Sequence, residues 1–361
     1  MNDWKTVRLG DVCEKGSSNI AQNEITDNNG EYPIYGAAGF IKNVDFYKQE
    51  KPYIGIVKDG AGVGRVSIHP AKSSLIVTMQ YIFPKENIDI KFLAEFLKYQ
   101  NLSRFYTGAT IPHIYFKDYQ NIPLKLPSLQ KQKLISAVLG KCTELIVKNK
   151  TILEKYDTLI KSRFIEMFGD PVINEKDWDL KTLPELGEFG RGVSKHRPRN
   201  APELLGGKYP LIQTGDVANA NLYITDYEST YSEEGFKQSK MWKAGTLCIT
   251  IAATIAKTAI LTFDSCFPDS VVGFTPNEKT NSLFINYWFS FFQKILEEQA
   301  PAVAQKNINL QVLSELKIIT PPISLQNDFA TFVQQIDKSK FEIWLYINMC
   351  VIIEKRVFVY D

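Results

Sequence analysis

A segment rich in cationic side chains, residues 190–199, is interrupted by glycine and proline. Cationic residues in such a loop are typical of contacts with a DNA backbone, because they neutralise phosphates and release counterions. A glutamine and a threonine lie just beyond the segment, and glutamine can form a bidentate hydrogen-bond pair with adenine. A solvated surface loop is the alternative. The candidate DNA-binding residues of this region are Arg191, Lys195, His196, Arg197, Arg199, Gln213 and Thr214.

A second candidate is the glycine-rich run Gly60–Gly64, which Arg65 follows. Backbone N–H groups in such a turn can hold an anion, but the run lacks the Lys-Ser/Thr of a nucleotide-binding P-loop. Its counterpart, residues 252–257, contains no glycine. The sequence therefore favours a tight turn between strands over a nucleotide site. Such a turn would bring Lys58, Arg65 and Lys257 towards DNA phosphates or guanine edges.

A third candidate is a polar position that precedes an isoleucine in each half of the chain. His113 takes this position in the first half and Asn307 takes it in the second. With the neighbouring Tyr115 and Lys306, these residues are candidates for DNA contact. A turn or core role is the alternative.

No motif in the sequence supports catalysis. The three histidines, His69, His113 and His196, are far apart and lack a metal-ligand spacing. The Asn-Pro-Pro-Tyr loop of adenine methyltransferases is also absent. We therefore expect a chain that is not an enzyme and that binds no cofactor and no metal.

The segments that must position these residues occur twice in the sequence. Trp4, Leu9 and Asp11 recur as Trp178, Leu183 and Glu185, and later in each half Ile114, Pro127 and Gln132 recur as Ile308, Pro321 and Gln326. The second copy carries about 20 extra residues in its middle, which is typical of a duplicated structural unit with an insertion.

Each copy reads as a mixed α/β module with a mainly antiparallel sheet. Short apolar runs bounded by Gly and Pro predict strands, and apolar residues at helical spacing predict one helix per module. The predicted strands are Tyr53–Val57, Arg65–Ile68, Leu75–Phe83, Leu247–Ile251 and Ala259–Phe263, and the predicted helices surround Phe92–Leu97 and span Leu283–Glu298.

A long segment with apolar residues at alternating steps of three and four follows each module, which is the pattern of a coiled-coil seam. Ser128 and Ser324 are candidate helix N-caps, and Gly169-Asp170-Pro171 should end the first helix. Two such helices can pack antiparallel. The predicted seam consists of Ile135, Val138, Cys142, Leu145, Ile152 and Leu159 in the first helix, and Phe329, Phe332, Ile336, Ile343 and Ile353 in the second.

Composition limits the class of protein. The 361 residues suffice for about two domains, and 44% apolar residues argue for a folded chain. A net charge of +2 neither demands nor excludes a polyanionic partner. Five scattered cysteines argue for a reducing, cytoplasmic location, and the longest apolar stretch, Ile343–Ile353, is too short to cross a bilayer.

Four features carry a resemblance to a known family: the Trp-x4-Leu-x-Asp/Glu openings, residues 209–216 (Tyr-Pro-Leu-Ile-Gln-Thr-Gly-Asp), the small-residue turns before Arg65 and Lys257, and the Pro-x4-Gln helix starts. Taken in this duplicated order, they make the whole chain resemble a specificity subunit of a type I restriction–modification system. The resemblance implies two target-recognition domains, residues 1–127 and 169–322, with a central conserved helix at 128–168 and a C-terminal conserved helix at 323–361. The implied fold class is α/β (α+β), with two similar modules separated by two long antiparallel coiled-coil helices related by a pseudo-two-fold axis.

The resemblance also implies the function and the partners. Each domain would read one half of a bipartite site in double-stranded DNA, while the helices would set the gap and dock other subunits. The expected partners are two methyltransferase subunits, which bind S-adenosylmethionine, and restriction subunits, which use ATP and Mg²⁺. A two-module scaffold that does not bind DNA, or less plausibly a nucleotide-binding enzyme, is the alternative. One departure from the family is the apolar residues nearly all round the last helix, such as Trp344, Leu345 and Met349; such a helix needs burial on several sides.

Overall fold

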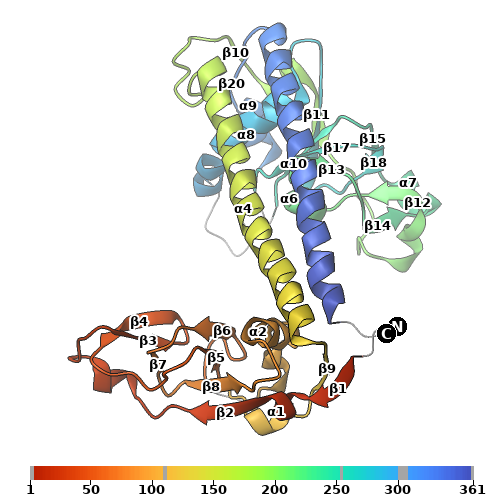
Figure 1. The fold of residues 1–361 in the computed structure, drawn as a ribbon. Coiled ribbons are helices and arrows are strands. Elements are labelled where there is room, and N and C mark those ends of the chain that lie inside the picture. The colour runs from red at the N-terminus through yellow and green to blue at the C-terminus, as the bar shows by residue number, and fades with distance from the viewer. Residues whose placement is uncertain (1–3, 109–111, 253–254, 300–307, 359–361) are drawn as a thin grey trace. The chain divides into compact units, whose positions relative to one another are not determined.

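The computed structural model describes residues 4–108, 112–252, 255–299 and 308–358 (Figure 1). The chain divides into two compact units. Unit 1 comprises Met1–Lys150 and Trp344–Asp361, and unit 2 comprises Thr151–Ile343. The two long helices run through both: α4 spans Leu129–Phe168 and α10 spans Ile323–Val357. Parts of both helices are buried in the cores of the two units.

Unit 1 contains a four-stranded antiparallel sheet in the order β2-β8-β5-β6, a three-stranded sheet β4-β3-β7, and the pair β1-β9. Its strands are β1 Lys5–Arg8, β2 Cys13–Ser17, β3 Tyr32–Gly36, β4 Gly39–Val44, β5 Tyr53–Val57, β6 Val66–His69, β7 Ser74–Leu75, β8 Met79–Pro84 and β9 Pro123–Leu126. Its shorter helices are α1 Leu9–Val12, α2 Ile90–Tyr99 and α3 Phe116–Tyr119, with 3-10 turns η1 Gln22–Ile25 and η2 Leu102–Phe105.

Unit 2 contains a five-stranded sheet β11-β19-β16-β17-β13, a four-stranded sheet β14-β12-β18-β15, and the pair β10-β20. Its strands are β10 Leu180–Lys181, β11 Gly187–Arg191, β12 Leu205–Leu211, β13 Tyr223–Ile224, β14 Ser229–Tyr231, β15 Met241–Trp242, β16 Leu247–Thr250, β17 Thr258–Leu261, β18 Ser265–Cys266, β19 Val271–Pro276 and β20 Ile318–Ile319. Its shorter helices are α5 Leu183–Leu186, α6 Thr214–Asn219, α7 Glu233–Lys237, α8 Ser282–Gln299 and α9 Leu310–Glu315, with the 3-10 turn η3 Pro202–Leu204.

The two units repeat one set of elements in one order, which confirms the predicted duplication and mixed α/β class. The sheet β2-β8-β5-β6 corresponds to β11-β19-β16-β17, and both second sheets contain one parallel pair, β3 with β7 and β12 with β18. The extra residues of the second copy form α6, β13, α7 and β15, between β12 and β16. One predicted strand was wrong: Leu75–Phe83 is divided between β7 and β8, because its two ends pair in different sheets.

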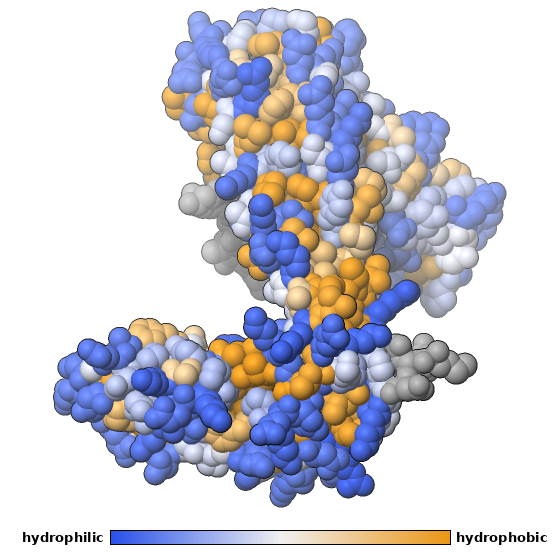
Figure 2. Space-filling model, in the orientation of Figure 1, coloured by the Kyte–Doolittle hydropathy of each residue, from blue (hydrophilic) through white to orange (hydrophobic). Residues whose placement is uncertain are grey.

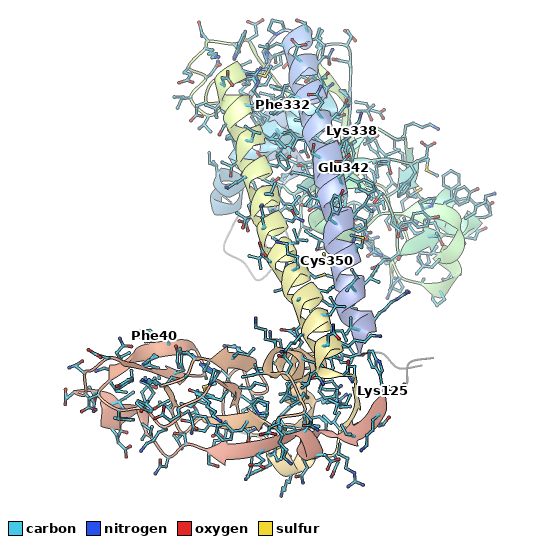
Figure 3. All side chains as sticks on the ribbon, in the orientation of Figure 1. Phe40, Lys125, Phe332, Lys338, Glu342 and Cys350 are labelled. Carbon is cyan, nitrogen blue, oxygen red and sulfur yellow. The ribbon has the colours of Figure 1, made fainter. Side chains whose placement is uncertain are left out.

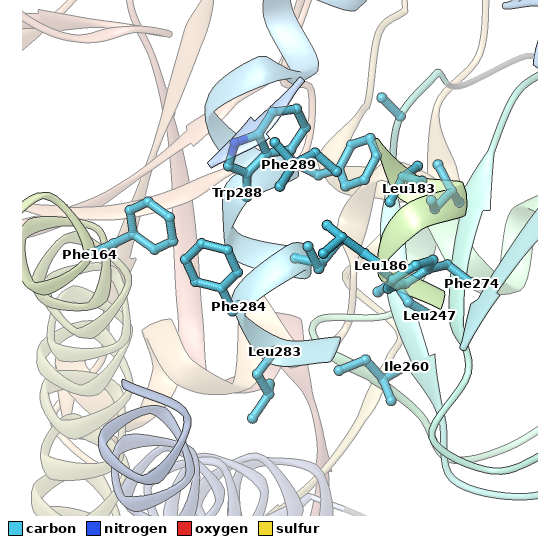
Figure 4. Close-up of a cluster of buried hydrophobic side chains, with 14 of the residues drawn as sticks. Phe164, Leu183, Leu186, Leu247, Ile260, Phe274, Leu283, Phe284, Trp288 and Phe289 are labelled. Atoms are coloured by element: carbon cyan, nitrogen blue, oxygen red, sulfur yellow. The ribbon is translucent and has the colours of Figure 1, made fainter. Parts of the chain in front are cut away.

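The core of unit 2 joins α4 and α8 to the larger sheet (Figure 4). Phe164 of α4 stacks on Phe284 of α8 with ring centroids 5.5 Å apart. Leu186 and Phe274, both fully buried, close the core from α5 and β19. Each large apolar side chain that is buried this way contributes roughly 1.5–3 kcal/mol, so the C-terminal part of α4 is held in the core of unit 2.

The core of unit 1 includes Phe358, the residue that directly follows α10. Phe358 is 4% exposed and lies against the rings of Phe92, Phe96 and Tyr99, with centroid distances of 5.6, 5.7 and 5.5 Å. Phe358 thus completes the core of the first module, which no local sequence pattern predicted.

The long helices pair antiparallel in each unit. In unit 1, Thr143 of α4 donates a hydrogen bond to Glu354, near the end of α10, at 3.1 Å. In unit 2, Asp157 forms an ion pair with Lys340, which lies earlier in α10. Later residues of α4 therefore contact earlier residues of α10, which is the order of an antiparallel pair. Gly169, with φ +75°, ends α4 as predicted.

Part of the predicted seam was wrong. Val138, Leu145 and Leu159 are 43%, 37% and 45% exposed, and their neighbours Leu139, Ile146 and Ile160 take the more buried positions. Adjacent apolar residues satisfy either register, and only packing selects one. The other seam residues are buried or half-buried: Ile135, Cys142, Ile152, Phe329, Phe332, Ile336, Ile343 and Ile353.

Two local features complete the helix pair. Burial, together with a contact with Cys350 (labelled in Figure 3), raises the pKa of the Cys142 thiol to about 11. The N-cap expected at Ser324 was wrong, since α10 already begins at Ile323, whereas Ser128 directly precedes α4.

The last helix keeps the uncovered apolar surface that its sequence predicts. Trp344, Leu345, Met349 and Ile352 are 48–53% exposed, and Figure 2 shows apolar surface over this part of α10. Within the described residues, no helix is both long enough and apolar enough to cross a membrane.

Candidate nucleic-acid interface

The glycine-rich run and its alanine-rich counterpart form equivalent turns. In unit 1, Val57 N–H donates to Arg65 O at 3.0 Å and Gly64 N–H donates to Val57 O at 2.8 Å. In unit 2, Thr250 N–H donates to Lys257 O and Ala256 N–H donates to Thr250 O, both at 2.9 Å. The two turns therefore place Arg65 and Lys257 at the same position, directly before β6 and β17.

Both turns need a residue with positive φ just before the cation. Gly64 has φ +86° and Ala256 has φ +55°. A Cβ on Gly64 would come within 2.5 Å of the backbone nitrogen of Ser103, so only glycine fits there. The turn joins antiparallel strands and is not followed by a helix, which confirms the strand-turn prediction and removes the P-loop alternative, because that site uses a helix N-terminus.

In unit 1 the segment predicted to contact DNA lies beside this turn, and in unit 2 Ile308, the described residue that follows the predicted segment, lies beside the equivalent turn. Ile114 N–H donates to Lys58 O at 3.0 Å, and Ile308 N–H donates to Ile251 O at 2.9 Å. The structure therefore brings Lys58 and His113 together in unit 1. Lys306 and Asn307, their expected counterparts in unit 2, lie outside the described residues.

Charge on the unit 1 surface is partly neutralised by one carboxylate. Asp59 contacts the His113 imidazole Nδ1 and lies 3.6 Å from Lys58 Nζ. Tyr115 is 48% exposed, and its ring centroid lies 4.1 Å from that of His113. Lys117 Nζ lies 5.1 Å from the centroid of the Tyr115 ring. A cation and an aromatic ring at one exposed site suit contacts with phosphates and with bases.

Sequence reasoning missed the hairpin tip next to this surface. The Arg65 guanidinium donates to Ala37 O at 2.9 Å, which ties the β3–β4 turn to the glycine-rich turn. Phe40, at the start of β4, is 61% exposed and is labelled in Figure 3. No local sequence pattern predicts that an exposed aromatic residue has a role. The hydrogen bond from Arg65 to Ala37 places the hairpin that carries Phe40 beside the site.

The basic loop of unit 2 is held by contacts with other segments of the same unit. Both Arg197 and Arg199 form ion pairs with Asp269, the former at 3.3 Å. His196 Nε2 lies 3.7 Å from Glu203, and the amide of Lys195 donates to the side chain of Gln238. All four predicted residues of this loop, like Arg191 at the end of β11, are exposed.

Gln213 and Thr214 lie at the start of α6, where the chain leaves β12. Gln213 is exposed; its amide N–H is bonded to Asp216, and its side-chain Nε2 lies 3.3 Å from Ser229 Oγ. In unit 1 the chain leaves β3 at the equivalent position through Gly36, because β3 and β12 each pair in parallel with a following short strand. The two units therefore carry different side chains at this equivalent position.

The remaining histidine and the cysteines lie away from these surfaces in buried positions. In the described part of the chain, no group of three or more His, Cys, Asp or Glu could hold a metal ion. His69 is buried beneath β5, and burial lowers its pKa to about 4. The five cysteines are buried and unpaired.

Known proteins share this architecture. Residues 1–156 and 175–344 match the family model of the type I restriction modification DNA specificity domain. The chain is 23% identical over 370 residues to the type I restriction enzyme EcoDI specificity subunit of Escherichia coli, covering 92% of this chain and 81% of that protein. It is 24% identical over 385 residues to the MjaVIII specificity subunit of Methanocaldococcus jannaschii, covering 93% and 86%.

Solved structures show the same fold. The S subunit of a type I restriction–modification system from M. genitalium superposes with a TM-score of 0.66 at 15% identity, covering 100% of this chain and 97% of that one. A second structure, described with the complex assembly of the type I R-M system, superposes with a TM-score of 0.59 at 14% identity, covering 98% and 96%. With two equivalent modules, two long helices and a family model matching most of its length, this chain belongs to the type I restriction–modification DNA specificity family and is a specificity subunit.

Proposed function

We propose that this specificity subunit reads a bipartite DNA sequence, one half with each module. The observation that supports this most is the pair of equivalent turns, each of which places one cation, Arg65 or Lys257, directly before a strand of the larger sheet. Phosphate contacts of this kind position a protein on DNA, and neighbouring polar and aromatic groups read bases. Because the exposed side chains of the two units differ, with Phe40 of β4 in unit 1 and Gln213 at the start of α6 in unit 2, we expect two different half-sites.

The partners belong to the same proposal. Two methyltransferase subunits with S-adenosylmethionine, and restriction subunits with ATP and Mg²⁺, would supply the chemistry in the cytoplasm, while this chain would be non-catalytic. The exposed apolar residues of α10, such as Trp344 and Met349, support a docking role for the helices, because large uncovered apolar patches mark interaction surfaces.

The test replaces the basic loop and measures DNA binding by the assembled methyltransferase complex. We expect the triple variant Lys195→Ala, Arg197→Ala, Arg199→Ala to bind the cognate duplex more weakly and to lower the slope of log K against log salt by up to about 3. Methylome sequencing of cells that express the complex should first identify the bipartite, adenine-methylated motif that serves as cognate duplex.

The matched control removes the same charge elsewhere in unit 2. Lys243, Lys279 and Lys317 are exposed and lie outside the basic loop, so their triple alanine variant should keep the wild-type affinity. Equal losses in both triple variants would point to bulk charge alone. No loss in the loop variant, with no methylated motif in cells, would favour the scaffold alternative.

A further inference from the structure

A buried glutamine marks the first turn of each long helix. Gln132 of α4 is 0% exposed, yet every polar atom of its side chain is bonded. Its Nε2 donates to Pro127 O at 2.8 Å and to Asn87 O at 3.1 Å, and its Oε1 accepts from the amide of Asp89 at 2.7 Å. One side chain thus connects three points of the backbone.

Gln326 of α10 repeats this network in unit 2. It is also 0% exposed. Its Nε2 donates to Pro321 O at 2.8 Å and to Lys279 O at 3.2 Å, and its Oε1 accepts from the amide of Asn281 at 3.1 Å. The same donors and acceptors are therefore used twice, although the surrounding sequences differ.

The bonded backbone groups explain what the glutamine connects. Asp89 and Asn281 directly precede α2 and α8, the module helices, while Pro127 and Pro321 lie at the entry to the long helices. An apolar side chain of similar size would fill the space but would leave the backbone groups that the amide bonds without a partner, whereas a fully bonded buried amide restricts the site to one geometry. A network of this kind selects an orientation.

We propose that Gln132 and Gln326 are positioning residues that fix the angle between each long helix and its own module. A secondary link accompanies each glutamine and differs between units: Ser136 Oγ donates to the Asp89 carboxylate at 3.3 Å, and Asn281 Nδ2 donates to Asn327 Oδ1 at 3.1 Å. The glutamine is the shared part of the joint. On the proposed function, this angle determines which gap between half-sites the subunit accepts.

The first experiment measures the angle without DNA. Nitroxide labels on Lys98→Cys of α2 and Lys141→Cys of α4, both exposed in unit 1, report one distance distribution by pulsed electron spin resonance. We expect the distribution to broaden in Gln132→Met and to stay narrow in Gln130→Met, because Gln130 is an exposed glutamine of the same helix. The five native cysteines are buried and should stay unlabelled.

A second variant covers a failure to fold. Gln132→Glu keeps an oxygen for the Asp89 amide and, when protonated, one donor, so it should broaden the distribution less than Gln132→Met. An unchanged distribution in a folded variant, judged by circular dichroism, would overturn the positioning role.

The second experiment rests on the proposed function. In the methyltransferase complex, Gln132→Met should raise the rate on duplexes with one base pair more or fewer between half-sites, relative to the cognate duplex, by roughly tenfold. The preferred bases within each half-site should not change. If the distance distribution broadens in Gln132→Met but the wild-type complex methylates no duplex, the proposed function alone is refuted. If the distribution stays narrow in Gln132→Met and its selectivity for the gap is unchanged, the positioning role alone is refuted.

Discussion

At the scale of single residues, the two turn cations should each account for one phosphate contact. Arg65→Ala and Lys257→Ala should each weaken binding of the complex to cognate and non-cognate duplexes alike, and each should reduce the salt slope by about 1. Lys51→Ala, which removes an exposed lysine of unit 1 outside the site, is the control. A salt slope that does not change in either turn variant would exclude both cations from the interface.

Buried His69 should make the stability of unit 1 depend on pH. Burial lowers its pKa to about 4, below the value near 6.5 of an unfolded chain. Below pH 6.5 His69 binds a proton in the unfolded chain but stays neutral in the folded chain. The free energy of unfolding is therefore unaffected by protonation of His69 above that pH and falls, by up to about 3 kcal/mol, as the pH drops towards 4.

Urea unfolding at about pH 7.5 and about pH 5 tests this. We expect His69→Gln to lose less stability than the wild type over this interval. His196→Gln makes the same change at an exposed histidine and should behave as the wild type does. An equal loss in all three proteins would rule out His69 as the source.

At the scale of elements, neighbouring apolar residues of α4 should differ sharply in their contribution to stability. Leu139 is 2% exposed and Val138 is 43% exposed. Leu139→Ala should lower the free energy of unfolding by about 2–5 kcal/mol, because it opens a cavity, whereas Val138→Ala should change it by roughly 0.5 kcal/mol or less. Denaturant unfolding of the two variants distinguishes the observed seam from the one that the heptads predict.

The glycine-rich turn allows a similar comparison. Gly60 and Gly64 both have positive φ, but a Cβ on Gly60 would meet open space, while one on Gly64 would collide with backbone. Gly60→Ala should cost about 1 kcal/mol of strain. Gly64→Ala should cost more and should also displace Arg65, so thermal unfolding and DNA affinity should both fall further in that variant. Equal effects would mean that the turn adapts freely.

At the scale of the whole molecule, the length of the helix pair should set the accepted gap. Four residues added to both α4 and α10 lengthen each by about 6 Å, close to one helical turn. At 3.4 Å per base pair, the preferred gap should grow by about one or two base pairs. Methylation of a duplex series with different gaps measures this, and an unchanged optimum would show that the helices are not the ruler.

Much of the fold could be predicted because it is local or repeated. β5 has the predicted bounds, Tyr53–Val57, and α2 contains the predicted Phe92–Leu97 face, since alternating or helical apolar spacing is dictated by strand and helix geometry. The missed strands, such as β3 and β4, have their apolar residues interrupted by Gly, Pro or polar residues. They form because partners distant in sequence complete their hydrogen bonds, and no local pattern records such partners.

The sequence by itself determined the duplication, the class of each module, the paired helices and the basic loop, because these depend on composition and spacing along the chain. The structure confirmed that Arg65 and Lys257 follow equivalent turns. Only the tertiary structure decided that Phe40 belongs to the surface beside Arg65, and that Leu139 rather than Val138 is buried. Each of these depends on contacts between segments far apart in sequence. Physical proximity of that kind arises from packing, which selects one arrangement among several that the local pattern allows.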